Sequence, residues 1–144
     1  MVTLDYKLSA DWNPYELDLR SADEMTLRYD AFPGDIVFRI DDADFSAQWG
    51  WVPILDFALA LRTIVERLDG HDRELFEFTE SGATIGFRRD GGTIEISTSY
   101  ASAIARAPLF ELSNAVDTFI DELADALETQ HPELADNEFF TDLV

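Results

Sequence analysis

Carboxylates are the side chains in this sequence whose spacing could support catalysis. Turn signals divide residues 74–100 into three predicted strands. With two-residue loops, Glu77 and Glu95 lie on either side of Gly86, with their backbones about 9–10 Å apart, and Arg88 is the diagonal neighbour of Glu95. Two carboxylates across a glycine gap could serve acid–base chemistry. The same residues also suit the open polar face of a one-sided sheet.

Other candidate ligands are isolated along the chain. The acids of DDAD (41–44) suggest calcium, but the twelve-residue loop pattern fails, because from Asp42 the required glycine falls on Ala47. His71 and His131 lie in predicted loops, and neither is spaced with a second ligand. The chain has no cysteine, and it contains no phosphate-binding loop or nucleophile motif. We therefore expect no metal site, no cofactor and no enzymatic activity.

The charge of the chain is its most unusual property. Thirty acids against ten bases give a formal net charge of −20. Residues 107–144 contain ten of the acids and no Lys or Arg. Such a field repels nucleic acid and anionic membranes, and it attracts basic partners. An acid-rich proteome, such as that of a salt-loving organism, would give a similar composition, so this explanation stays open.

Most acids of this base-free region lie on a predicted helix over about 109–130, and the others lie in the tail that follows. On the helix, Asp117, Asp121, Asp125 and Glu128 fall within about 80 degrees of arc, opposite the apolar stripe. Like charges at i, i+4 each cost about 0.2–0.5 kcal/mol, and no base on the helix relieves them. A solvated acidic face is one interpretation, and a docking surface for a basic protein is the other. The predicted partner-binding residues are Asp117, Asp121, Asp125, Glu128, Glu133, Asp136, Glu138, Glu77 and Glu95.

The elements that position these residues follow from hydrophobic periodicity and turn signals. A turn at Pro33-Gly34 places Leu27 opposite Ile40, and a turn at Asp42-Ala43 places Ile36 opposite Trp49. Trp49 and Trp51 then share the core side of a strand, where we expect them to pack between sheet and helix. A partly exposed aromatic surface, or a ligand pocket beneath it, is the alternative. The predicted strands are 25–32, 36–41, 44–51, 74–80, 83–89 and 92–100, with a helix over about 53–69 and a possible edge strand in VTLDYKLS.

These elements predict one α+β domain over residues 1–144. It consists of an antiparallel sheet of six to seven strands, built from two strand-strand-strand-helix units, with two helices packed on one face. The second unit places Phe76 opposite Phe87, and Phe87 opposite Ile94. The units span 25–70 and 74–130, and a C-terminal tail spans 131–144.

The runs WVPILDFALALRTIVERL (51–68) and LFEFTESGATIGFRRDGGTIEIS (75–97) carry a family resemblance. In order and texture, residues 25–130 resemble the small immunity proteins of bacterial polymorphic toxin systems, in which a hairpin region, an apolar helix, a second meander and a closing helix follow one another. No functional residue is transferred by position. The resemblance implies tight, stoichiometric binding to a cognate toxin, often a basic nuclease, by electrostatic complementarity.

The sequence therefore predicts a non-enzymatic, acidic, cytoplasmic protein that binds a basic protein partner, and neither nucleic acid nor membrane. No signal peptide is visible, and no apolar run approaches the roughly 20 residues that cross a bilayer. Two alternatives stay open. One is a housekeeping domain adapted to high salt, and the other is an enzyme or small-ligand protein that uses the Glu77 and Glu95 face.

Overall fold

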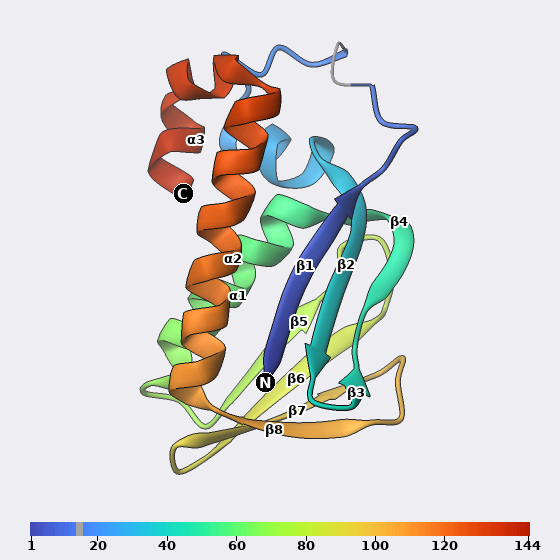
Figure 1. The fold of residues 1–144 in the computed structure, drawn as a ribbon, viewed down its shortest axis with the longest axis vertical. Coiled ribbons are helices and arrows are strands. Elements are labelled where there is room, and N and C mark those ends of the chain that lie inside the picture. The colour runs from blue at the N-terminus through green and yellow to red at the C-terminus, as the bar shows by residue number, and fades with distance from the viewer. Residues whose placement is uncertain (14–15) are drawn as a thin grey trace.

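The computed structural model describes residues 1–13 and 16–144, and its fold is α+β (Figure 1). Two antiparallel four-stranded sheets are present, which we call the first sheet (β1–β4) and the second sheet (β5–β8). The strands are β1 (Val2–Leu8), β2 (Pro33–Ile40), β3 (Ala43–Asp44), β4 (Ala47–Pro53), β5 (Arg73–Glu77), β6 (Thr84–Asp90), β7 (Thr93–Thr98) and β8 (Ile104–Pro108). The helical elements are η2 (Thr26–Asp30), α1 (Ile54–Leu68), α2 (Leu109–Gln130), η3 (Pro132–Asp136) and α3 (Glu138–Leu143).

The prediction of one sheet of six to seven strands is wrong. In the first sheet, β2 pairs with β1 on one side and with β3 and β4 on the other, whereas the second sheet runs in the order β5-β6-β7-β8. The sequence-based prediction omitted β8, which closes the second sheet as an edge strand beside β7. The strands of the two predicted units therefore form two separate sheets and do not join in a single sheet.

The first sheet begins with β1, so the predicted edge strand in VTLDYKLS is confirmed. It pairs with β2 in a regular antiparallel register from Val2 opposite Ile40 to Leu8 opposite Gly34. The predicted strand 25–32 is wrong, because Thr26–Asp30 forms a helical turn instead. A helix-capping contact explains the difference, since the Asp23 carboxylate accepts a hydrogen bond from the Thr26 amide at 2.9 Å.

The predicted registers of both meanders differ from the structure by two residues. Ile36 lies opposite Ala47 instead of Trp49, because the tight turn falls at Asp41-Asp42, where Asp41 has a φ of 51°. In the second sheet, Phe76 lies opposite Ile85. In the second sheet this slip keeps each side chain on its predicted face but changes its cross-strand neighbour. In the first sheet a register irregularity between Gly34 and Ile36 shifts the pairing again, so that Gly34 lies opposite Val52.

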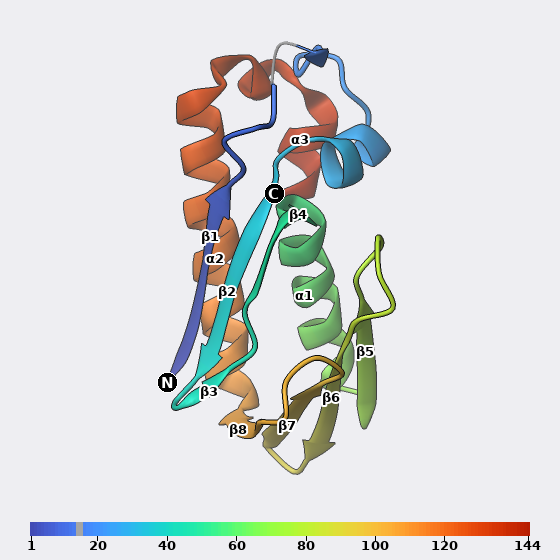
Figure 2. The ribbon, with the colours of Figure 1, turned by 90° about the vertical axis from the view of Figure 1, so that its right-hand side faces the viewer.

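One hydrophobic core unites the sheets and helices. The predicted α2 stripe is confirmed, and α1 buries both faces of its first two turns. Helix α1 packs on α2 and β5, and α2 also packs on β1 and β8, so the two helices do not cover one face of a single sheet. Figure 2 shows α1 between the first sheet and β5. The buried stripe of α2 comprises Leu112, Val116, Phe119, Ile120, Leu123 and Leu127.

The C-terminal segment is held by one buried amide. Asn137 is 1% exposed, and its Nδ2 donates to the carbonyls of Leu19 and Ala22 at 2.8 and 2.9 Å. Its Oδ1 accepts from the amide of Phe140, which is itself buried. These contacts fix η3 and α3 beside the upper half of α2 (Figure 1).

Candidate functional site

The outer face of α2 is an acidic surface. Asp117, Asp121 and Asp125 are exposed at one-turn intervals, and Glu128 is half-buried at the next turn. None of these four carboxylates forms an ion pair within residues 1–13 and 16–144. Because the opposite face of α2 is buried in the core, the helix presents these charges outward. We call these four residues the α2 acidic face.

The predicted acids of the C-terminal segment form a second, smaller group. Asp136 and Glu138 line one hollow of about 230 Å³ together with Asp142, whereas Glu133 is half-buried on η3. Asp136 is neutralised in part by Arg20 at 3.1 Å, although both side chains are more than 60% exposed. An exposed pair of this kind contributes little to stability. Of the two elements that carry these acids, η3 packs on α2, and α3 packs on η3.

Glu77 and Glu95 do not flank Gly86, so the predicted pair of carboxylates across a glycine is wrong. Gly86 lies between Leu75 and Ser97 in the observed register. Glu77 is opposite Thr84, and Glu95 is opposite Arg88. The two-residue slip in each hairpin moves the two carboxylates into different rows of the sheet.

Glu95 instead forms ion pairs with two arginine side chains, Arg88 and Arg106. Its Oε2 accepts hydrogen bonds from Nη2 of Arg88 and from Nη2 of Arg106, both at 2.9 Å. These two hydrogen bonds hold the pKa of Glu95 below its ordinary value, with further help from the two positive charges. A carboxylate held ionised in this way is a poor proton donor, and it is not available to a basic partner.

Two acids of residues 41–44 and the two histidines, which the sequence offered as isolated candidate ligands, contact neighbouring groups in the structure. The Asp41 carboxylate accepts from the N-terminal ammonium group, and Asp44 caps the amide of Ser46 at 3.0 Å. His71 is exposed and contacts the Arg67 carbonyl, whereas the ring of His131 packs near Trp12. In the described part of the chain no group of three or more His, Cys, Asp or Glu could hold a metal ion.

Trp49 and Trp51 pack against other aromatic side chains, and Trp49 is also partly exposed. Both the packing and the surface interpretation from the sequence therefore hold in part. Their rings stack with centroids 5.3 Å apart, and Trp49 meets Phe78 and Tyr100 edge-on at 5.0 and 5.2 Å. Trp49 nevertheless remains 37% exposed. Gly50, with a φ of +80°, lies between them at a backbone conformation that suits glycine. The two tryptophans line a hollow of about 380 Å³ beside the Ser81-Gly82 turn.

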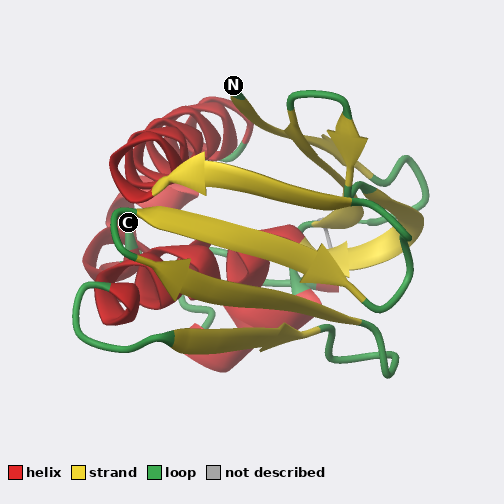
Figure 3. Cartoon of the chain, turned by 90° about the horizontal axis from the view of Figure 1, so that it is seen from below, coloured by secondary structure: helices red, strands yellow, loops and turns green. Residues whose placement is uncertain are grey.

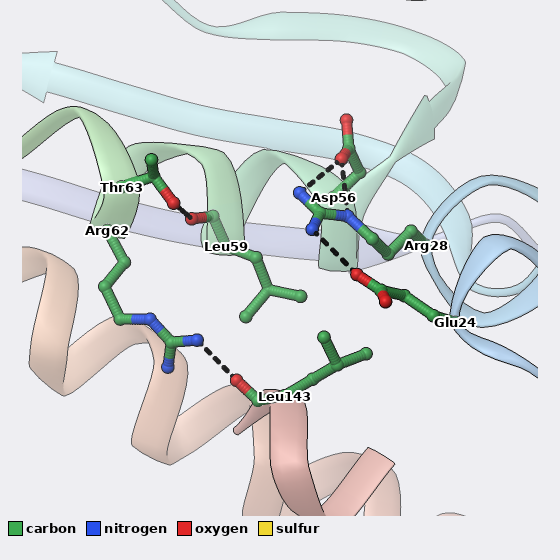
Figure 4. A network of polar contacts seen from close by, with 7 residues as sticks. All are labelled: Glu24, Arg28, Asp56, Leu59, Arg62, Thr63 and Leu143. Carbon is green, nitrogen blue, oxygen red and sulfur yellow. Dashed lines mark hydrogen bonds and ion pairs between the residues drawn. The ribbon is translucent and has the colours of Figure 1, made fainter. Parts of the chain in front are cut away.

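An ion pair between η2 and α1 was not predicted from the sequence (Figure 4). Arg28 reaches Asp56, which is only 8% exposed although it stands in the first turn of an apolar helix. Glu24 accepts a longer contact from the same guanidinium at 3.5 Å. An acid inside the apolar run ILDFALAL was the one available signal, because buried carboxylates are normally paired.

Comparisons of the chain with protein-family models, with curated proteins and with solved structures find no match. Across residues 1–13 and 16–144, no helix has both the length and the apolar character needed to span a bilayer. The functional assignment therefore depends on the surfaces described above.

Proposed function

We propose that this chain is a non-enzymatic binding protein that occludes a basic protein partner. The observation that carries the proposal is the α2 acidic face, where Asp117, Asp121, Asp125 and Glu128 point outward with no ion pair within the described residues. Three like charges at successive i, i+4 positions destabilise the helix that bears them. A basic partner would relieve this repulsion on binding.

The distribution of basic residues also supports the α2 acidic face as the binding surface. The region 107–144 contains ten acids and no Lys or Arg. Within the described chain two positive groups form ion pairs there, the N-terminal ammonium with Glu111 and Arg20 with Asp136. Attraction over such a surface raises the association rate of a basic protein, and salt weakens it. Asp136, Glu138 and Asp142 would extend the contact around the C-terminal end of α2.

The specific form that we propose is an immunity protein that neutralises a basic toxin domain. Its support is the resemblance of residues 25–130 to the immunity proteins of bacterial polymorphic toxin systems, together with the net charge of −20. A cytoplasmic location would suit this role. Glu95 no longer belongs to the proposed contact, because Arg88 and Arg106 neutralise it.

The experiment compares two variants of equal net charge. The first is Asp117→Asn, Asp121→Asn, Asp125→Asn on the α2 acidic face. The control is Asp11→Asn, Asp30→Asn, Asp42→Asn, three exposed acids on other segments. Wild type and variants are immobilised and exposed to lysate of the source organism at about 50 mM salt, and retained proteins are eluted at about 500 mM.

The proposal predicts that one basic protein binds wild type and the control variant but not the α2 variant. The purified partner should then bind wild type stoichiometrically, with an affinity that falls steeply as salt rises. Equal loss in both variants would mean that only total charge matters, which contradicts a defined docking surface. Absence of any specific partner, together with stability that rises toward molar salt, would support adaptation to a salty cytoplasm instead.

A further inference from the structure

The outer face of the second sheet carries two parallel rows of side chains that run across all four strands. In the first, Arg73, Arg88, Glu95 and Arg106 lie opposite one another in sequence, and we call it the arginine row. The second, two residues further along each strand, is the glycine row. It comprises Leu75, Gly86, Ser97 and Ile104.

The arginine row has more positive charge than its one acid can neutralise. It contains three of the chain's ten basic residues and a single carboxylate. Arg88 and Arg106 share Oε2 of Glu95, whereas Arg73 forms no ion pair within residues 1–13 and 16–144. Arg73 also lies directly opposite Arg88, and like charges opposed in a ladder repel each other. An added carboxylate between the two guanidinium groups would remove that repulsion.

The glycine row borders a surface hollow beside this charge, with an aliphatic side chain at each end of the row. Leu75 and Ile104 are 56% and 65% exposed at its two ends. Between them Gly86 has no side chain, and a Cβ atom there would meet nothing closer than Ser97 Oγ at 3.6 Å. A hollow of about 510 Å³ is lined by residues of both rows, including Arg73, Arg88 and Glu95, and by Glu74 and Phe87. The face is open in the view from below, where no helix of the described chain lies in front of these strands (Figure 3).

We propose that this face docks an extended segment of a protein partner with the pattern carboxylate-x-aliphatic. The two rows are two residues apart on each strand, which is about 6.5–7 Å. Side chains i and i+2 of an extended peptide lie on one face at the same spacing. The carboxylate would bind between Arg73 and Arg88 in charge-assisted hydrogen bonds, and the aliphatic side chain would lie over Gly86 beside Leu75.

A peptide segment fits this face better than nucleic acid. The residues of the two rows include no aromatic side chain on which a base could stack, and the net charge of −20 repels a polyanion over longer distances. The surface also differs from the α2 acidic face in its charge, so this inference does not depend on the proposed function. A partner could bind here with or without occupying α2.

The test uses the ¹⁵N-labelled full chain and the blocked pentapeptide Thr-Glu-Thr-Leu-Thr. We expect saturable NMR shifts of the arginine Nε–Hε groups of Arg73 and Arg88 and of the amides of Gly86 and Ser97. Replacing Glu by Gln, or Leu by Ser, in the peptide should weaken binding about tenfold, because a charge-assisted contact or the buried aliphatic group is lost. The variant Arg73→Gln should weaken it similarly. Because the Arg73 guanidinium forms no ion pair in the part of the chain that the structure describes, the fold should persist.

The matched control is Lys7→Gln, which removes one exposed positive charge from the first sheet and should change the affinity less than twofold. Three outcomes would overturn the proposal. They are the absence of shifts at millimolar peptide, equal binding of the Glu and Gln peptides, and equal or stronger binding of inorganic phosphate or a deoxythymidine hexamer at the same four groups. The last outcome would identify a general anion or nucleic-acid surface instead of a peptide surface.

Discussion

Arg28 donates from both Nε and Nη2 to a single oxygen of Asp56, Oδ1, at 2.9 and 2.8 Å. The two side chains are 22% and 11% exposed, so water screens this pair less than it screens the other ion pairs between side chains in the described chain. The contact joins η2 to the first turn of α1 (Figure 4). It therefore links the segment before β2 to α1, beside the apolar contact that buried Leu27 makes with the core.

Arg28→Gln should lower the free energy of unfolding by about 2–3 kcal/mol, because it leaves the Asp56 carboxylate in a poorly solvated place without its cation. Urea unfolding at pH 7 measures the change. The matched control is Arg20→Gln, whose pair with Asp136 is exposed and should contribute less than about 1 kcal/mol. Equal losses in the two variants would mean that burial does not strengthen the Arg28 pair.

Hydrophobic periodicity, together with turn signals at the ends, was enough to predict the two long helices. The predicted helix over 109–130 matches α2, and the apolar stripe of α1 is buried from Ile54 to Leu68. A stripe of this kind depends only on positions within one segment. The acids of the α2 acidic face could be predicted for the same reason, since they lie opposite a stripe that the sequence specifies directly.

Cross-strand neighbours could not be predicted in the same way. An alternating pattern specifies which face a residue occupies, and a slip of two residues leaves that face unchanged. Phe76 finds an apolar partner in either register, Phe87 in one and Ile85 in the other. The arginine row was missed because it requires three correct registers at once, including that of the unpredicted strand β8.

Gly34 sits where β1 and β2 approach closely. A Cβ atom there would lie 2.1 Å from the Lys7 carbonyl oxygen and 2.9 Å from Ile54 Cδ1. Gly34→Ala should therefore lower the free energy of unfolding by about 1–3 kcal/mol or more, because backbone must move to admit the methyl group. Gly82→Ala is the control, since nothing lies within 4 Å of its added Cβ, and it should be neutral or stabilising by up to about 1 kcal/mol. Thermal and urea unfolding of both variants measure the contrast, and similar losses would count against a close approach at Gly34.

Glu95 should contribute to the pH dependence of stability. Hydrogen bonds from Arg88 and Arg106 lower its pKa in the folded chain. The unfolded chain therefore binds its proton first as pH falls. The stabilisation is fully present above the ordinary glutamate pKa of about 4.3, and it is lost as pH falls through the lower folded value.

The variant Glu95→Gln should accordingly be less stable than wild type at pH 7, and the difference should shrink as the pH is lowered from about 5 to 3. Urea unfolding across this range measures it. Glu77→Gln on the same face is the control, because Glu77 has no ion pair within residues 1–13 and 16–144, and its effect should be small at both ends. If the difference in stability between Glu95→Gln and wild type stays constant with pH, the proposed effect of Arg88 and Arg106 on the pKa of Glu95 is contradicted.

The α2 acidic face should lower the stability of the chain that carries it. Asp117, Asp121 and Asp125 form two like-charged i, i+4 pairs, each worth about 0.2–0.5 kcal/mol of repulsion. The last turn of α2 also has no base to interact with the helix dipole. Replacing the three residues by Asn should therefore raise the free energy of unfolding by about 0.4–1 kcal/mol at about 50 mM salt.

Urea unfolding at about 50 and 500 mM salt measures this gain, which should decrease at the higher salt because exposed charges are then screened. The control Asp11→Asn, Asp30→Asn, Asp42→Asn lies on separate segments and should gain less. A variant that is more stable than wild type yet no longer binds the partner would separate the two roles of these acids. A loss of stability would instead mean that the carboxylates make contacts that support the fold, and the repulsion argument for a docking surface on α2 would then fail.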